Sequence, residues 1–190
     1  MKKNGKIQTA DLCYVAVFTA ILAVTAQISI PLPGGVPLTL QTFAVPLAGL
    51  VLGAKRGAAS SLLYVLLAAV GVPVLAGMKG GIAAVFGMTG GFLLSFPLMA
   101  WLAGRYAARG IRSVAWWMGL IMGALVNYAV GTLWFMLIAH TGLSQALMAC
   151  VVPFLPTAVL KLVLAGLVGS VLRSALRRAG LLLDKNCESC

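Results

Sequence analysis

Residues 146–172 read ALMACVVPFLPTAVLKLVLAGLVGSVL, an apolar run that contains a single charged side chain, Lys161. A helix of about 20 apolar residues crosses the hydrocarbon core of a bilayer, so this run is long enough to span a membrane. A charge near the middle of such a helix costs about 2.5–3.5 kcal/mol on insertion scales. The run therefore predicts a membrane helix, and Lys161 is the first candidate for a functional residue.

The rest of the chain has the same character. Of its 190 residues, 62% are hydrophobic and 9% are charged, whereas about 25% of the residues of a typical soluble domain are charged. The mean hydropathy is +1.06. Turn signals divide the remaining apolar sequence into five further spans, at about residues 11–30, 40–53, 58–72, 86–104 and 114–139. We therefore predict one all-α integral membrane domain, residues 1–190, with six transmembrane helices and a tail at 173–190.

The distribution of basic residues predicts the orientation of these helices. If the N-terminus is cytoplasmic, every Lys and Arg except Lys79 and Lys161 lies on the cytoplasmic side. This pattern satisfies the positive-inside rule and places both termini in the cytoplasm of a multi-pass plasma membrane protein. The net charge of +11 is divided among short loops, so it does not indicate a nucleic-acid-binding surface.

Lys161 is expected to have no carboxylate partner within the chain. The sequence has three acidic residues, all near the predicted cytoplasmic ends: Asp11, Asp184 and Glu188. Pro153 and Pro156 favour a helix start, which places Lys161 about one to two turns below the outer surface. At that depth Lys161 could meet the carboxylate of an anionic ligand, extend to the surface, or bond to backbone carbonyls.

Other polar residues are expected at a similar depth. They are Gln41 and Thr42, Thr89 in the segment GMTGG, and Asn127 with Tyr128. Two loops rich in Pro and Gly, PLPGGVPLTLQT at 31–42 and GVPVLAGMKGG at 71–81, are placed to cap a pocket formed by these residues. For each residue the alternative is a hydrogen bond between helices, which is common in membrane bundles.

Several functional classes lack support in the sequence. It contains no Walker P-loop, no HExxH motif and no Ser/His/Asp set, so neither an ATPase nor a hydrolytic enzyme is predicted. Apart from Asp11, at the cytoplasmic end of the first span, no acidic residue lies in a span, which argues against a proton-coupled transporter. Cys13 and Cys150 are expected to pack in apolar surroundings, and Cys187 and Cys190 to be reduced thiols rather than half of a zinc site.

Small residues on the first predicted helix suggest a close contact with another helix. Ala16 and Ala20 form an A-x-x-x-A pair on one helical face. The contact could be internal to this chain, or it could dock a different membrane subunit.

Four segments resemble a known family: 37–77, 80–104, the NYAVGTLW segment at 127–134 and the PFLPTAVLK segment at 153–161. They are similar to BioY, the biotin-specific S-component of energy-coupling-factor (ECF) transporters. The resemblance implies a six-helix subunit that captures biotin outside the cell and docks on a transmembrane coupling subunit with two cytoplasmic ATPases. ATP would be used by those partners, and no cofactor is expected in this chain.

The resemblance also implies roles for individual residues. The family's binding positions match Gln41, Thr42, Tyr128 and Lys161, the loop around Lys79, and the segment from Thr89 through Gly90 to Gly91. Ala16 and Ala20 match its docking motif, and the loop before the second helix matches its gating loop.

Two positions depart from the family pattern. Ala158 stands where an Asp is usual, which removes an acceptor for a ureido N–H, and Met88 replaces the Pro of GPTGG. Gln41, Asn127 and Tyr128 remain as partners for a ureido ring beside a glycine wall at Gly90 and Gly91, with Lys161 or Lys79 for the carboxylate. The alternatives are an S-component for a different small carboxylate vitamin, an ATP-independent biotin facilitator, a membrane enzyme, and an assembly subunit without a ligand.

Overall fold

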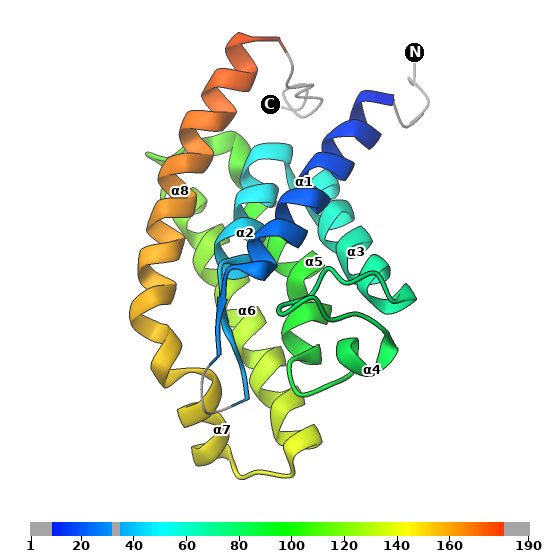
Figure 1. Ribbon diagram of the computed structural model, residues 1–190. Helices are drawn as coiled ribbons and strands as arrows, with labels where there is room; N and C mark the ends of the chain where they lie inside the picture. The colour runs from blue at the N-terminus through cyan, green and yellow to red at the C-terminus, as the bar shows by residue number, and fades with distance from the viewer. Residues whose placement is uncertain (1–8, 32–34, 181–190) are drawn as a thin grey trace, which may run out of the picture.

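The computed structural model describes residues 9–31 and 35–180, which form a helical bundle (Figure 1). Its long helices are α1 (Thr9–Gln27), α2 (Gln41–Leu52), α3 (Ala54–Val70), α5 (Gly90–Arg105), α6 (Val114–Ala139) and α8 (Leu155–Arg178). The shorter elements are α4 (Ile82–Val85), α7 (Leu143–Cys150) and the 3-10 turns η1 (Ala107–Arg109) and η2 (Val152–Phe154). Each predicted span therefore overlaps a long helix, and α6 has the predicted bounds.

The predicted sixth span is not one continuous helix. Within 146–172, helix α7 ends at Cys150, the turn η2 follows, and α8 begins at Leu155. The reason is that proline lacks a backbone N–H and cannot continue the helical hydrogen-bond ladder. Pro153 lies in η2, and Pro156 lies in the first turn of α8, where a missing N–H has no cost. The break redirects the chain and places Phe154 at the bundle interior, where it is buried.

The loop between α1 and α2 contains a short hairpin. Strand β1 (Ser29–Ile30) pairs antiparallel with β2 (Leu38–Thr39), and Ser29 lies opposite Thr39. The hairpin extends down the side of the bundle before the chain enters α2 (Figure 1). It therefore brings the residues just before α2 against the bundle at a fixed register.

Helix α5 lies at the centre of the bundle and contacts α2, α3 and α6. Glycines allow this packing because they have no side chain at the points where the helices cross. A Cβ on Gly49 of α2 would overlap the carbonyl oxygen of Ala100 in α5, and one on Gly104 of α5 would overlap Ala54 at the start of α3. The three helices therefore meet backbone to backbone.

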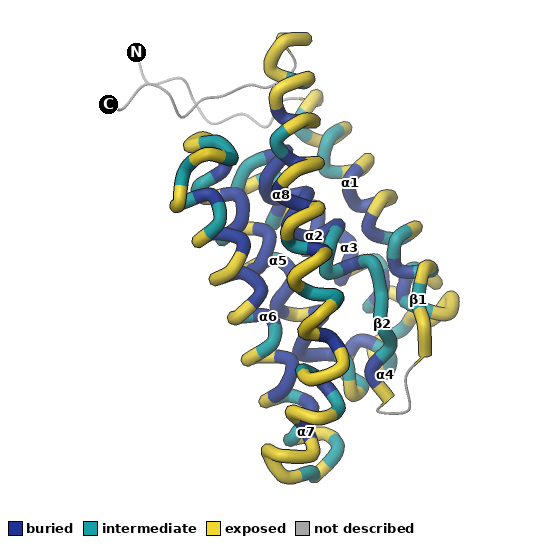
Figure 2. The backbone as a smooth tube through the Cα atoms, turned by 90° about the vertical axis from the view of Figure 1, so that its left-hand side faces the viewer, coloured by how far each residue is buried: buried dark blue, intermediate teal, exposed yellow. Residues whose placement is uncertain are grey.

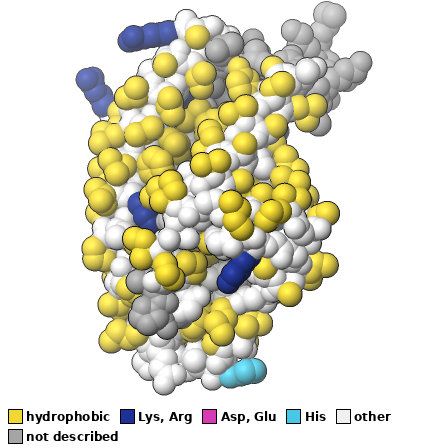
Figure 3. All heavy atoms as spheres, viewed as in Figure 1, with side chains coloured by type: hydrophobic (Ala, Val, Ile, Leu, Met, Phe, Trp, Pro, Cys, Tyr) yellow, Lys and Arg dark blue, Asp and Glu magenta, His cyan; other side chains and the backbone are white. Residues whose placement is uncertain are grey.

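The outer surfaces of the helices are apolar. Val24, Leu137 and Val171 are 65%, 70% and 67% exposed, and the exposed positions follow the outward sides of α6 and α8 (Figure 2). Hydrophobic side chains cover much of the face in Figure 3, where no acidic side chain is visible among the described residues. A surface of this kind fits a lipid environment better than water.

Three described segments are long and apolar enough to cross a membrane: Thr9–Gln27, Val114–Ala139 and Leu143–Arg178. The start of α1 and the end of α8 lie at the same end of the bundle (Figure 1). This placement agrees with termini on one side of a membrane. Six transmembrane crossings and the cytoplasmic orientation remain predictions.

Candidate functional site

A cavity of about 320 Å³ lies in the half of the bundle remote from the two chain ends. It is bounded by the segment before α2, the loop between α3 and α4, the first turns of α5, and residues from α6, α7 and η2. Its volume is within the range of small-molecule binding sites. The two Pro/Gly-rich loops predicted to cap a pocket therefore both contribute to its walls.

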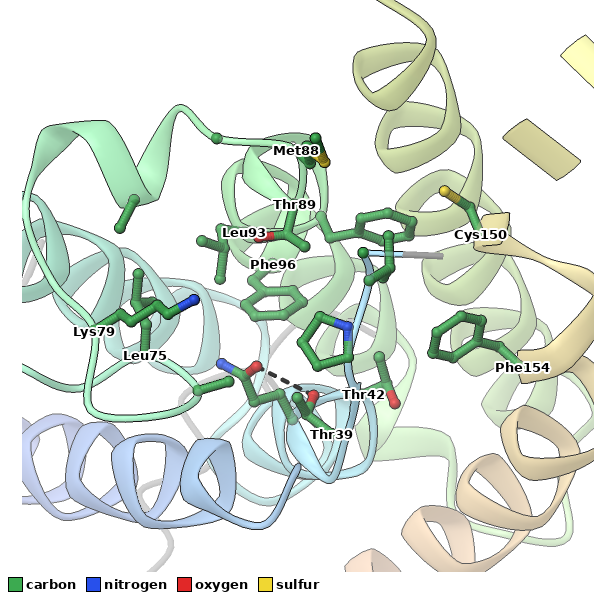
Figure 4. Close-up of a pocket in the computed structure, with 18 of the residues that line it drawn as sticks. Thr39, Thr42, Leu75, Lys79, Met88, Thr89, Leu93, Phe96, Cys150 and Phe154 are labelled. Carbon is green, nitrogen blue, oxygen red and sulfur yellow. Dashed lines mark hydrogen bonds between the residues drawn. The ribbon is translucent and has the colours of Figure 1, made fainter. Parts of the chain in front are cut away.

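Aromatic side chains form much of the cavity wall. Phe92 and Phe96, one turn apart on α5, both line the cavity. Phe96 and Phe154 of η2 approach it from different sides (Figure 4). The ring of Tyr128 on α6 meets Phe92 edge to face, at 6.3 Å between centroids and an interplanar angle of 85°. These rings are suited to enclosing a compact, largely apolar ligand.

Polar groups gather where β2 meets α2. The hydroxyl of Thr39 donates to Oε1 of Gln41 at 3.1 Å, and Nε2 of Gln41 donates to the Tyr64 hydroxyl at 2.7 Å. That hydroxyl donates in turn to the carbonyl of Val74 at 3.0 Å. The chain of bonds joins the hairpin, α2, α3 and the following loop. Thr42 and Thr89 also line the cavity.

Lys79 extends into the cavity from the loop between α3 and α4. Its amino group is turned toward the interior (Figure 4), and it is the only charged side chain among the described lining residues. Gln27, the last residue of α1, holds this loop. Its Nε2 donates to the carbonyl of Leu75 at 3.1 Å, and its Oε1 accepts the N–H of Met78 at 3.1 Å. The position of Lys79 thus depends on the end of α1.

Lys161 lies behind the cavity wall rather than in it. Its Nζ donates to the carbonyl oxygen of Thr39 at 2.7 Å and to the Thr42 hydroxyl at 3.3 Å, and the residue is 9% exposed. Thr39 and Thr42 themselves line the cavity. Of the three roles considered for Lys161, the structure shows the bond to a backbone carbonyl. This bond ties α8 to the start of α2.

The model of the BioY family matches residues 1–178 of this sequence. The chain belongs to the BioY family. It is 42% identical over 157 residues to a probable biotin transporter BioY of Pyrococcus horikoshii. The matched region covers 82% of this chain and 91% of that protein. It is 40% identical over 159 residues to the biotin transporter BioY of Thermotoga maritima, with 83% of this chain and 92% of that protein covered.

A solved structure has the same fold. The S-component for biotin from an ECF-type ABC transporter superposes with a TM-score of 0.78 at 27% identity, covering 89% of this chain and 95% of that one. The relatives' names describe transporters, so the BioY family has a transport role rather than a catalytic one. The family assignment and the expectation of a non-enzyme are thus confirmed.

Some residues predicted for the site of this BioY chain lie elsewhere. Asn127 is not among the residues that line the cavity, and its Nδ2 donates to the Phe92 carbonyl at 3.0 Å and to the Ser95 hydroxyl at 2.7 Å. Gly90 and Gly91 are buried against Trp134, where a Cβ would overlap neighbouring atoms. These three residues serve the contact between α5 and α6. Gln41, Thr42, Thr89, Tyr128 and Lys79 do line the cavity.

The remaining predicted positions are the docking pair on α1 and the four cysteines. Ala16 and Ala20 are both exposed on α1, so this pair is not used for packing within the described chain. Cys13 is exposed, while Cys150 is buried and its residue borders the cavity. Cys187 and Cys190 fall outside the described residues.

Thr39 and the aromatic residues of the wall were not predicted as site residues from the sequence. Phe92 and Phe96 are spaced one helical turn apart directly after the glycines at 90 and 91, which is a signal for one face at the start of a helix. Phe154 follows the proline that breaks the sixth run. Both patterns were visible, but apolar residues are so common in this chain that they did not stand out.

Proposed function

We propose that this chain is the substrate-binding membrane subunit of a biotin uptake transporter and that biotin occupies the cavity beside Lys79. The observation that carries the proposal is the composition of the cavity: aromatic walls, a polar cluster where β2 meets α2, and one cation. Biotin has matching parts, an apolar fused ring, a ureido group with two N–H donors and one carbonyl, and a carboxylate. The biotin transporters and the biotin S-component among the relatives support this choice of ligand.

The hydrogen bonds already present define which groups can meet the ureido ring. Thr39 uses its hydrogen in the bond to Gln41, so its hydroxyl oxygen can accept a ureido N–H. Thr42 accepts from Lys161, so its own hydrogen can point to the ureido carbonyl. Lys161 would thereby orient a ligand-binding hydroxyl without touching the ligand. This arrangement offers an acceptor although Ala158 lacks the usual carboxylate.

Lys79 is the partner that we assign to the biotin carboxylate. It extends from the loop that closes one side of the cavity, and a bond to a charged group in a site shielded from water is stronger than a neutral hydrogen bond. A ligand held by both the β2–α2 junction and this loop would keep the loop closed. In the predicted orientation, the cavity opens to the outside of a prokaryotic plasma membrane.

Transport itself would require partners. We propose that α1 docks through the exposed face carrying Ala16 and Ala20 on an ECF transmembrane subunit that is driven by two ATPases. Two small residues at i and i+4 allow a second helix to approach closely. Gln27 at the end of the same helix holds the Lys79 loop. A movement of α1 on docking would therefore shift this loop at the cavity.

Uptake of labelled biotin tests the proposal in cells that lack their own biotin transporter. Cells with this chain and an ECF module should accumulate biotin well above cells with the module alone. Accumulation by this chain without any module would instead indicate an ATP-independent facilitator. Absence of uptake and of binding, with the protein folded in the membrane, would refute the biotin assignment.

Ala16→Leu should block transport while leaving biotin binding unchanged. The larger side chain prevents close approach on the docking face, whereas the cavity lies in the other half of the bundle. Ala129→Leu is the matched control, because Ala129 is an exposed alanine on α6. Equal uptake by the two variants would mean that the face at Ala16 is not the docking surface.

Lys161→Met should weaken stability and ligand binding together. Loss of the Nζ bonds leaves the Thr39 carbonyl without this donor, at a cost of about 1–3 kcal/mol, and frees the Thr42 hydroxyl to turn away. We expect a lower melting temperature and weaker binding of biotin and of uncharged biotin amide by the same factor. Leu160→Met, at a residue 60% exposed on the same helix, serves as the control. A loss confined to biotin would place its carboxylate on Lys161.

A further inference from the structure

Tyr64 of α3 is fully buried and is not among the residues that line the cavity beside Lys79, but hydrogen bonds join it to that cavity. Its hydroxyl accepts from Nε2 of Gln41 at 2.7 Å and donates to the carbonyl oxygen of Val74 at 3.0 Å. Gln41 in turn accepts the hydroxyl hydrogen of Thr39 at 3.1 Å, the bond drawn dashed in Figure 4. A chain of three bonds therefore runs from a hydroxyl at the cavity to a backbone carbonyl outside it.

The direction of this chain is fixed at the carbonyl of Val74. A carbonyl oxygen only accepts, so the Tyr64 hydroxyl pairs with it by donating its one hydrogen. The Tyr64 oxygen then remains as an acceptor, which requires the N–H side of the Gln41 amide to face it. The amide oxygen of Gln41 consequently faces Thr39, and Thr39 has to donate. The orientation of all three side chains thus follows from one backbone group.

The reversed chain is disfavoured because its members are shielded from water. Gln41 is only 5% exposed, and Tyr64 is fully buried. If the Gln41 amide turned over, Tyr64 would donate to it, and the Tyr64 oxygen would face the Val74 carbonyl without a hydrogen between them. The carbonyl would then keep only the longer bond from Gln27, at 3.3 Å. Two acceptors in contact away from water are unfavourable, so the observed direction predominates.

The direction of the chain decides what Thr39 presents to the cavity. Its hydrogen points to Gln41, so its hydroxyl oxygen is an acceptor toward a ligand. The backbone of Thr39 is held separately, by the pairing of β2 with β1 and by the bond from Lys161 to its carbonyl oxygen at 2.7 Å. Reversal of the chain would therefore leave the residue in place and convert its hydroxyl from an acceptor into a donor.

We propose that Tyr64 is a positioning residue that makes the cavity specific for a cyclic urea, because it keeps the Thr39 hydroxyl as an acceptor. The inference rests on the proposed function, in which that hydroxyl accepts a ureido N–H of biotin. A ring that carries an oxygen in place of this N–H would meet the lone pairs of Thr39. Sites built to bond one ligand group reject analogues that lack it, since a buried partner is left unpaired.

A double-mutant cycle of Tyr64→Phe and Thr39→Val, followed by calorimetric titration of biotin, tests this proposal. Phenylalanine keeps the buried ring but lacks the hydroxyl, so the Gln41 amide is free to turn over and the Thr39 hydrogen is released. Each single variant should weaken biotin binding about tenfold, which corresponds to one hydrogen bond. In the Thr39→Val background no hydroxyl is left to reorient, so adding Tyr64→Phe should change binding by less than about threefold.

Tyr106→Phe is the matched control. Tyr106 follows α5 outside the cavity lining, and its ring lies 5.6 Å from the Arg109 guanidinium. This variant should bind biotin as the wild type does. If Tyr64 acted only by holding the loop at Val74, Tyr64→Phe would weaken binding equally in both backgrounds. Equal losses in the two backgrounds, or no loss in either, would overturn the proposal.

Melting temperatures show whether each variant is folded. If Tyr64→Phe does not fold, Gln41→Leu breaks the same chain at the neighbouring bond, and its effect on biotin binding should be smaller in the Thr39→Val background. An undiminished effect there would overturn the proposal. Absence of biotin binding by the folded wild type would refute the proposed function, whereas wild-type binding with additive losses in the cycle would refute this inference alone.

Discussion

Lys79→Met should weaken biotin binding by about ten- to a hundredfold, which corresponds to the loss of one hydrogen bond to a charged group. The lysine is the only charged side chain among the described residues that line the cavity, and its amino group is turned inward (Figure 4). Methionine keeps the length and flexibility of the side chain but removes the charge. Calorimetric titration of the purified variant would measure the effect.

Biotin amide shows whether the lost contact involves the carboxylate. The amide has no negative charge, so Lys79→Met should bind it about as well as the wild type does. The two ligands and the two proteins give four complexes, as in a double-mutant cycle. Only the complex of the wild type with biotin contains both Lys79 and the carboxylate, so the cycle isolates the interaction between them. Equal losses for both ligands would mean that Lys79 shapes the loop rather than binding the charge.

Gly49→Ala should destabilise the bundle even though alanine is the better helix former. A Cβ at this position overlaps the carbonyl oxygen of Ala100, which belongs to the backbone of α5 and cannot move alone. Overpacking of this kind costs about 1–3 kcal/mol or more, enough to lower the melting temperature by several degrees. Thermal unfolding in detergent, followed by circular dichroism, would measure the shift.

Gly142→Ala is the matched control for this substitution. Gly142 precedes α7, has an ordinary φ of −70°, and a Cβ there meets no atom within 4 Å. It should leave the melting temperature nearly unchanged. If the two variants melt alike, the close crossing of α2 and α5 is not what holds the bundle together.

Much of the helical arrangement could be predicted because a helix that faces lipid requires a long run of apolar residues. Long apolar runs interrupted by Pro, Gly and basic residues gave the position of each long helix, and α6 has the expected bounds. The break at 151–154 was harder to predict. Pro153 and Pro156 indicated a helix start, but the apolar residues before them concealed the separate helix α7. Hydropathy measures the affinity of a segment for lipid. It carries little information on whether the chain changes direction within an apolar segment.

The candidate site was predictable in outline but not in the role of each side chain. The sequence singled out two lysines away from the cytoplasmic segments without deciding between them. The structure separates them because the hairpin places the Thr39 carbonyl within 2.7 Å of Lys161, and Gln27 holds the loop of Lys79 over the cavity. Asn127 likewise has a partner in the backbone of α5 that no sequence pattern reveals. Such contacts depend on residues far apart in the chain.

The most direct test of the account is a calorimetric titration of biotin into the purified wild-type chain, without any coupling module. We predict saturable binding of one biotin per chain, because the cavity, its polar cluster and Lys79 all belong to this chain. Absence of binding by a sample that circular dichroism shows to be folded would contradict the account. The cavity would then have to be assigned to a different ligand.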